Sequence, residues 1–149
     1  MIDRYIRQYL SEAISAIKDS LLPLNKVIIN PNEYISSEVD EQDVYFEVYC
    51  GGVAPQYDTE NSTKTSVIGT IVINGKINVG SSLIDAISET LFYNFIPTNP
   101  LRKQGFKVRN FYDSNIVNVY ISNIERTETG IDNGRYKTTL FITFDIYEG

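Results

Sequence analysis

The last part of the chain constrains the fold most strongly, because its side chains alternate without interruption. In the run RYKTTLFITFDIYE at residues 135–148, one set of positions is mostly apolar and the other is more polar. The first set is Tyr136, Thr138, Leu140, Ile142, Phe144 and Ile146, and the second is Lys137, Thr139, Phe141, Thr143, Asp145 and Tyr147. Successive side chains of a strand point to opposite faces, so this run predicts a long strand with one buried face.

A second run upstream supplies a partner for this strand. Residues 116–124 read IVNVYISNI, and the polar stretch ERTETGIDNG separates them from the final run. Two strand-like runs joined by a polar turn pair most simply as an antiparallel hairpin. The second half of the chain is therefore expected to form antiparallel sheet.

Other runs extend the predicted sheet. Residues 43–50, DVYFEVYC, alternate; residues 66–73, SVIGTIVI, are rich in β-branched side chains; and residues 106–112 read FKVRNFY. Each of these runs predicts a strand. The dipeptide at Asn74 and Gly75 is typical of tight hairpin turns, so a short returning strand, KINV, is expected after it.

The segment GGVAPQYDTENSTKT, residues 51–65, differs from the runs on either side of it. It is rich in Gly, Ser, Thr, Asn and Asp and nearly free of aliphatic side chains. Unstructured loops of this length are uncommon in compact domains and usually have a function or are disordered. The composition predicts a long mobile loop.

Two segments have the periodicity of amphipathic helices. In residues 2–21 the apolar positions recur at three- and four-residue steps, and Pro23 then ends the helix. These positions are Ile2, Ile6, Tyr9, Leu10, Ala13, Ile14, Ile17 and Leu21. Residues 82–95 repeat the spacing, with Ser81 or Ser82 as the expected N-cap and Pro97 after the end.

The order of these elements predicts a fold class. A helix, strands, a second helix and further strands joined by hairpins favour an α+β domain over residues 1–149. We expect an antiparallel β-sheet with two amphipathic α-helices packed on one face.

The composition argues against most catalytic chemistry. The chain has no histidine, one cysteine (Cys50) and no glycine-rich phosphate loop. Imidazole-based catalysis and Cys/His zinc sites are thereby excluded, and Cys50 is expected to be a small buried apolar residue. The acidic cluster Asp40, Glu41 and Asp43 lacks the spacing of a calcium loop. We therefore predict no enzyme, with no catalytic residue, no metal ligand and no cofactor.

Two carboxylates interrupt predicted strands and are the remaining candidates for acid–base work. Glu47 and Asp145 both lie on the more polar side of their alternation, so they are expected to face solvent or an interface. The net charge of −6, from 13 Lys and Arg against 19 Asp and Glu, disfavours tight nucleic-acid binding. The start MIDRYIRQYL does not have the pattern of a signal peptide, and no apolar run is long enough to span a bilayer, so no membrane partner is expected.

The sequence resembles the tail terminator proteins of tailed bacteriophages. The resemblance rests on the first helix, the strand DVYFEVYC, a polar loop, a GTIVINGKINVGSS hairpin leading into the helix LIDAISETLFYNF, and a C-terminal hairpin ending RYKTTLFITFDIYEG. It implies a structural virion protein that forms a ring, expected to be a hexamer, on the head-proximal end of the tail tube. Such a ring ends tube polymerisation and provides the surface for head–tail joining.

The resemblance also implies partners and a location. The ring would contact other copies of itself, the tail tube protein and the head connector or neck protein, while DNA passes through its lumen without specific binding. The protein would be assembled in the host cytoplasm and reside in the tail or neck of the virion. Candidate residues for subunit or tube contacts are Lys103, Lys107 and Arg109 in a basic cluster, with Tyr57 and Asp58 in the polar segment.

Three alternatives remain open on the sequence, and the least favoured of them is a small enzyme, because the chain has no histidine. A head–tail connector or neck protein of a tailed phage would share the size and ring symmetry. A non-catalytic protein-binding module would use its sheet to hold a peptide and would remain a monomer.

Overall fold

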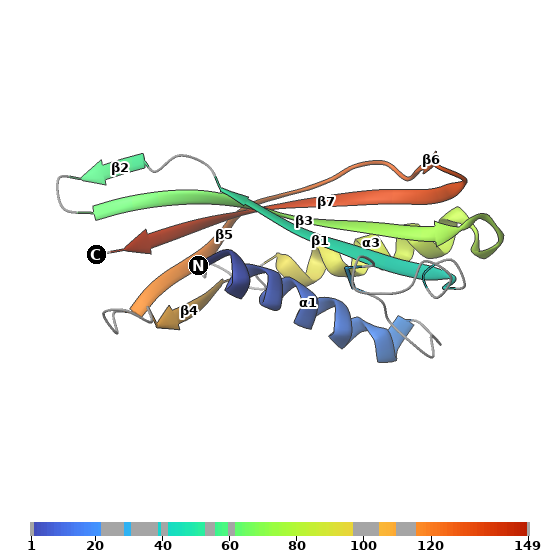
Figure 1. Cartoon of the computed structure of the whole chain (residues 1–149), viewed down its shortest axis with the longest axis horizontal. Coiled ribbons are helices and arrows are strands. Elements are labelled where there is room, and N and C mark those ends of the chain that lie inside the picture. The colour runs from blue at the N-terminus through green and yellow to red at the C-terminus, as the bar shows by residue number, and fades with distance from the viewer. Residues whose placement is uncertain are drawn as a thin grey trace.

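In the computed structural model, one twisted sheet runs the length of the molecule and both long helices lie on the same side of it (Figure 1). The residues that the structure describes are 2–21, 29–30, 39, 42–52, 56–59, 62–96, 105–109 and 116–148. The arrangement confirms the predicted α+β class with an antiparallel sheet and two helices on one face.

The strands pair antiparallel in the order β1-β3-β7-β5-β4, and an isolated bridge from Ile29 to Phe46 of β1 is parallel. Two short strands extend this arrangement, since β2 pairs with β3 and β6 pairs with β7. The bounds are β1 Val44–Gly52, β2 Gln56–Thr59, β3 Ser62–Lys76, β4 Gly105–Arg109, β5 Ile116–Arg126, β6 Gly130–Asp132 and β7 Arg135–Glu148. The expected hairpin is the pair β5–β7, and β7 lies between β3 and β5.

The helices cover the face that the alternation predicted to be buried. Helix α1 spans Ile2–Leu21, as the periodicity predicted, and α3 spans Ser81–Phe95. Both contact β3, and they contact each other. Along the strands the buried positions alternate in register, as in the row Val48, Ile71 and Leu140.

Aromatic side chains join the two helices to the sheet. The Tyr9 ring of α1 lies 6.0 Å from the Phe95 ring of α3 and 6.1 Å from the Phe144 ring of β7, measured between centroids. Phe95 and Phe144 are fully buried. Burying one large apolar side chain contributes about 1.5–3 kcal/mol, so this contact stabilises all three elements at once.

Asn74 and Gly75 do not form the predicted turn. Both residues continue β3, opposite Tyr45 and Val44 of β1, and Ile77–Val79 form a 3-10 helix, η2, in place of a returning strand. Asn74 is buried and its Nδ2 donates to Glu47 Oε2 at 3.4 Å. Long-range pairing on both sides of β3 overrides the local preference for a turn.

The Asn-Gly sequence that does turn the chain lies near the C-terminus. Asn133 and Gly134 have positive φ angles of 51° and 74°, and they connect β6 to β7. Two successive positive φ angles are the requirement of a type I′ turn. The polar stretch predicted as one turn therefore contains a short strand and a tight turn.

The prediction of a long loop over residues 51–65 is wrong for the residues described. Residues 51–52 belong to β1, residues 56–59 form β2, and β3 begins at Ser62. Here the backbone pairs with distant strands, because Thr63 lies opposite Glu148 and Lys64 opposite Tyr147. Threonine suits a half-buried strand, so the lack of aliphatic side chains does not prevent sheet formation.

Smaller differences concern element ends. Gly80, with φ of 84°, precedes α3 at the N-cap position, and no side-chain cap bond is formed, so the predicted serine cap is wrong. The predicted strand at 106–112 corresponds to β4, and residues 110–112 lie outside the described residues. Cys50 is half-buried and packs against the core.

Candidate functional site

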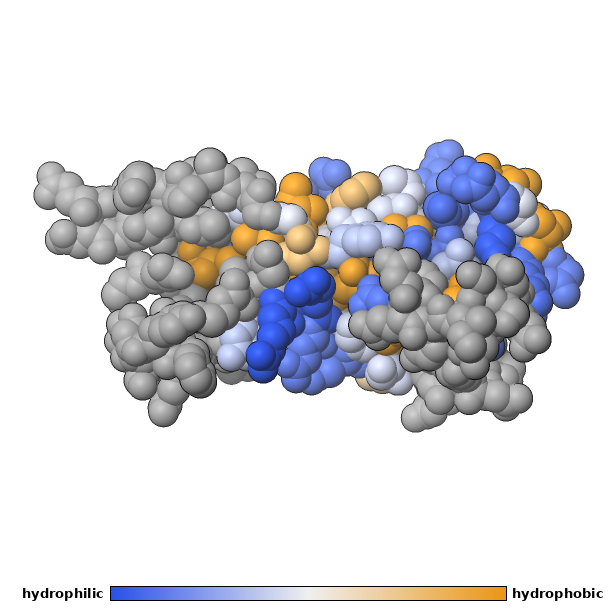
Figure 2. All heavy atoms as spheres, in the orientation of Figure 1, coloured by the Kyte–Doolittle hydropathy of each residue, from blue (hydrophilic) through white to orange (hydrophobic). Residues whose placement is uncertain are grey.

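The face of the sheet opposite the helices is covered by no described element. Three large apolar side chains are exposed on it: Tyr49 at 49%, Ile68 at 39% and Phe141 at 37% of their full area. Tyr49 and Phe141 lie in one row across β3, since both are paired with Thr70. The outer surface of α1 is instead hydrophilic (Figure 2). Among the described residues, this open sheet face is one surface suited to protein contact.

The two carboxylates on the open face do not form a catalytic pair. Asp145 is buried, at 7% exposure, and its Oδ1 accepts a hydrogen bond of 3.0 Å from Ser66 Oγ. Its expected exposure to solvent was therefore wrong. Glu47 pairs with Val72, six positions along β3 from Ser66. At a rise of about 3.3 Å per residue this places the carboxylates about 20 Å apart.

Glu47 instead interacts with two neighbouring side chains, those of Asn74 and Tyr49. It accepts the hydrogen bond from Asn74 and lies beside Tyr49 on the same face of β1. Burial first, and then the Glu47 carboxylate, raise the pKa of the Tyr49 hydroxyl above its ordinary value. Tyr49 therefore stays neutral in the physiological range and contributes an apolar ring with a polar tip.

The predicted interface residues lie at one end of the sheet and on opposite edges. Tyr57 and Asp58 are in β2, beside β3, whereas Lys107 and Arg109 are in β4, beside β5. Pairing through Lys64, Tyr147 and Asn118 places Gln56 of β2 and Lys107 in one row of the sheet, with β3, β7 and β5 between them. The structure thus does not bring the two groups together. Lys103 lies outside the described residues.

The second surface is the edge of β5 that follows the residues paired with β4. Strand β4 pairs with β5 only as far as Tyr120. The β5–β7 register then shifts between Ile121 and Asn123, which indicates a bulge. Bulges bend a strand and commonly end its pairing on one side. From Ile121 to Arg126, no strand in the described part of the chain pairs with this side of β5.

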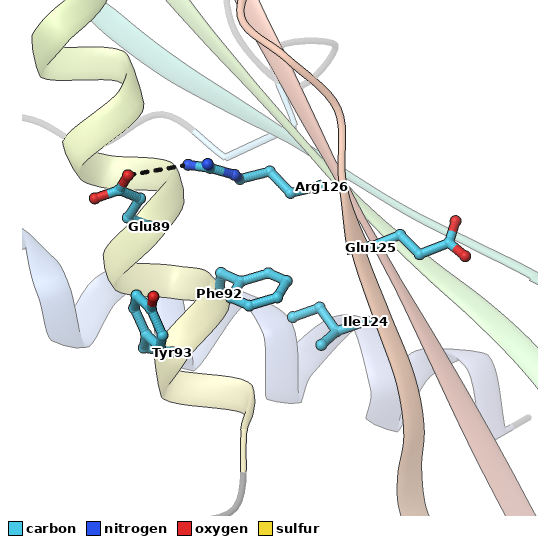
Figure 3. Close-up of a pocket in the computed structure, with 6 residues that line it drawn as sticks. All are labelled: Glu89, Phe92, Tyr93, Ile124, Glu125 and Arg126. Atoms are coloured by element: carbon cyan, nitrogen blue, oxygen red, sulfur yellow. Dashed lines mark ion pairs between the residues drawn. The ribbon is translucent and has the colours of Figure 1, made fainter.

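A groove lies between this edge and α3, and we name it the α3–β5 groove. It has a volume of about 520 Å³ and is lined by Glu89, Phe92, Tyr93, Ile124, Glu125 and Arg126. Phe92 and Ile124 point toward each other, whereas Glu125 points away from the helix (Figure 3). Tyr93 is 69% exposed. The groove therefore has an apolar floor and charged rims.

Arg126 ties the strand edge to the helix. Its Nη1 donates to Ser88 Oγ at 3.1 Å and lies 3.6 Å from Glu89 Oε1 (Figure 3). Ser88 Oγ in turn donates to the Asp85 carbonyl at 2.9 Å, so this fully buried serine uses both of its hydrogen-bonding roles. The contacts hold α3 at a fixed separation from β5.

An adjoining hollow continues the groove past the end of β5. It has a volume of about 340 Å³ and shares Glu89 and Arg126 with the α3–β5 groove. Its other lining residues are Ser81, Asp85, Thr127, Glu128 and Thr129. The Thr129 hydroxyl donates to Asp85 Oδ1, and Thr127 N donates to the Thr139 carbonyl at 3.0 Å, so the connection from β5 to β6 is held in place.

The groove was not predicted from the sequence, although one signal pointed to it. Phe92 and Tyr93 fall outside the apolar stripe of the second helix, which comprises Leu83, Ile84, Ile87, Leu91 and Phe95. Two adjacent aromatic side chains beyond a complete core stripe indicate a further contact surface.

Comparison with known proteins identifies no relative: no family model matches the sequence, and no curated protein matches it. Within the described ranges, no group of three or more His, Cys, Asp or Glu side chains is placed to hold a metal ion. None of the helices described is both long and apolar enough to cross a membrane. The fold and surfaces define an α+β protein with one open sheet face and an unpaired strand edge beside a groove.

Proposed function

We propose that this chain is a structural subunit of a tailed-phage virion, the tail terminator. Its copies form a ring, most simply a hexamer, that caps the tail tube, ends tube polymerisation and offers the surface for head–tail joining. The subunit has no catalytic role. It assembles in the host cytoplasm and remains in the tail or neck of the virion.

The observation that carries the proposal is the one-sided packing of the sheet. Both helices bury one face, which leaves the other face, with Tyr49, Ile68 and Phe141, open. A small domain that leaves large side chains exposed over one sheet face is suited to contact with other proteins. The first helix, the strand DVYFEVYC, the second helix and the C-terminal hairpin of the resemblance to tail terminators also support the proposal, whereas β3 and η2 stand in place of the expected GTIVINGKINVGSS hairpin.

The placement of the candidate interface strands supports a ring. A head-to-tail ring needs two different surfaces on each subunit, because each copy contacts its two neighbours differently. Strands β2 and β4 lie on opposite edges at the same end of the sheet. Contacts through Tyr57 and Asp58 on one side, and through Lys107 and Arg109 on the other, fit this geometry.

The charge of the chain fits the expected path of DNA. A ring of subunits with a formal net charge of −6 repels phosphate, so DNA passes through the lumen without being held. The remaining partners are the tail tube protein on one side and the head connector or neck protein on the other.

A tail-capping assay tests the proposal. Purified chain is added to polymerising tail tubes, and tube length and end structure are examined by electron microscopy. Tubes of limited length with a ring at one end are expected. Binding to portal complexes without binding to tubes would identify a connector, and a monomer that binds neither would contradict both virion roles.

A second candidate function, a non-catalytic protein-binding module, is favoured by one specific observation. The α3–β5 groove lies beside an unpaired strand edge, which is the geometry of peptide binding by strand addition. Analytical ultracentrifugation over a range of concentrations separates the candidates, because a binding module stays monomeric and contributes nothing to tube capping.

A further inference from the structure

We propose that the edge of β5 and the α3–β5 groove bind an extended segment of a partner protein as an added strand, in which basic and apolar residues alternate. The inference goes beyond the capping function and does not depend on it. It rests on the direction of the β5 backbone groups, the space beside β4, and the side chains that line the groove.

Within the described part of the chain, the backbone of β5 has no strand partner along this edge. Thr127 N donates to the Thr139 carbonyl, so this pair is hydrogen-bonded toward β7. In an antiparallel pair, residues alternate between facing the partner and facing away from it. Glu125 therefore faces Phe141 of β7, whereas the N–H and C=O groups of Ile124 and Arg126 point away from β7.

The space for an added strand continues the position of β4. Strand β4 runs antiparallel to β5 and its pairing ends with Gly105 opposite Tyr120. A partner strand placed beside Ile124–Arg126 lies along the groove, and α3 forms the wall beneath it. The contacts of Arg126 with Ser88 and Glu89 connect α3 to β5 at the end of this space.

The side chains of the groove select the two faces of the added strand. On the side toward α3, Phe92, Tyr93 and Ile124 offer an apolar surface. On the opposite side, Glu125 points to the open face of the sheet. Because the side chains of a strand alternate between faces, the ligand places apolar residues toward the helix and basic residues beside Glu125.

The charge around the groove favours a basic ligand. Among the described residues, the groove and the adjoining hollow are lined by the carboxylates of Asp85, Glu89, Glu125 and Glu128, against the single guanidinium of Arg126. Arg126 is already engaged by Ser88 and Glu89. Complementary charge raises association rates and discriminates against acidic partners.

A short peptide of alternating lysine and valine is the probe for this site. Titrated into isotope-labelled protein, it should shift the amide signals of Ile124 and Arg126 and slow their hydrogen exchange. The amide of Glu125, already bonded to β7, should change little. Two control peptides carry glutamate in place of lysine, or N-methyl groups at alternate backbone positions, and both should bind at least about tenfold more weakly.

Matched variants locate the site. Glu125→Lys reverses a charge on the groove rim and should weaken binding of the lysine–valine peptide about tenfold. Glu12→Lys makes the same charge change on the exposed side of α1 and should leave binding unchanged. Tyr93→Ala removes an exposed ring from the groove and should also weaken binding, and circular dichroism verifies that each variant is folded.

Several outcomes would overturn the proposal. These are equal binding of the N-methylated or glutamate peptide, no shift at Ile124 and Arg126 in peptide excess, or equal effects of the two lysine variants. Protection of the two amides that rises with protein concentration alone would mean that a second copy of this chain occupies the edge, which also contradicts a basic partner.

Discussion

Gly75 of β3 lies so close to Ile84 of α3 that a Cβ atom at residue 75 would stand 2.3 Å from Ile84 Cδ1. Ile84 is fully buried, so its side chain has little room to move. The glycine thus allows the start of α3 to pack directly on the backbone of β3. It is needed here for close approach and not for a turn.

Gly75→Ala should destabilise the protein by about 1–3 kcal/mol, because overpacking forces the core to shift. The matched control is Gly51→Ala on β1, where an added Cβ meets nothing within 4 Å. Urea unfolding of both variants measures the difference. Equal midpoints would show that the β3–α3 contact tolerates the extra methyl group.

Ile14→Asp should unfold the protein or lower its stability by several kcal/mol. Ile14 is fully buried in the core between α1 and the sheet, and a carboxylate there has no partner. A domain of this size has a total stability of about 5–15 kcal/mol, so much of it would be lost. Thermal unfolding followed by circular dichroism provides the measurement.

The control for this change is Ser15→Asp, at the next and exposed position of the same helix. It adds the same carboxylate without burial and should unfold close to the wild type. If Ile14→Asp melted like Ser15→Asp, the stripe of α1 would not form part of the core.

Asn74→Asp should make stability strongly dependent on pH. Asn74 is buried and donates to Glu47, so an aspartate there places two carboxylates in contact. A buried polar group without a hydrogen-bond partner lowers stability by about 1–3 kcal/mol, and repulsion between the two carboxylates adds to this cost. The cost falls as the pH is lowered and a carboxylate binds a proton, so denaturant midpoints of variant and wild type should converge at low pH. The change Asn94→Asp at an exposed position of α3 should show little of this trend.

Tyr49 should contribute to a loss of stability in alkaline solution. Its pKa is raised in the folded state, so the folded protein binds the phenolic proton more tightly than the unfolded chain does. The corresponding stability is complete below the unfolded pKa of about 10 and disappears as the pH rises through the folded value. Unfolding midpoints of Tyr49→Phe should fall less steeply above about pH 10 than those of the wild type. Parallel curves would contradict the assignment to Tyr49.

Reversal of the basic cluster should separate assembly from folding. Lys103→Glu together with Arg109→Glu is expected to impair capping of tail tubes while the subunit stays folded, because a protein contact made by these residues would lose its charge complementarity. The capping assay and a filter-binding assay with duplex DNA are run side by side at moderate salt. Tight DNA binding by the wild type, lost in the double variant while capping persists, would instead indicate a nucleic-acid function.

The sequence alone predicts the elements in which the regular spacing of apolar residues matches the side chains that the fold buries. The spacing of Ile6, Leu10, Ile14 and Ile17 predicts α1 with its bounds, and these four side chains are buried as expected. The alternation from Tyr136 to Ile146 likewise predicts β7 and its inward face. In such segments, residues a few positions apart along the chain are enough to predict the helix or strand.

Tertiary structure alone decided the features that depend on distant partners. The sequence Asn-Gly turns the chain at residues 133–134 but continues a strand at residues 74–75. Residues 74–75 stay in β3 because they pair with β1 on one side and with β7 on the other. The polar residues 62–65 form a strand because β7 provides their partner. The α3–β5 groove lies where, among the described residues, β5 has no strand partner after the end of β4 and a bulge after Ile121. Pairing energies between segments far apart in the chain outweigh local preferences of a few tenths of a kcal/mol to about 1 kcal/mol, and no local pattern records them.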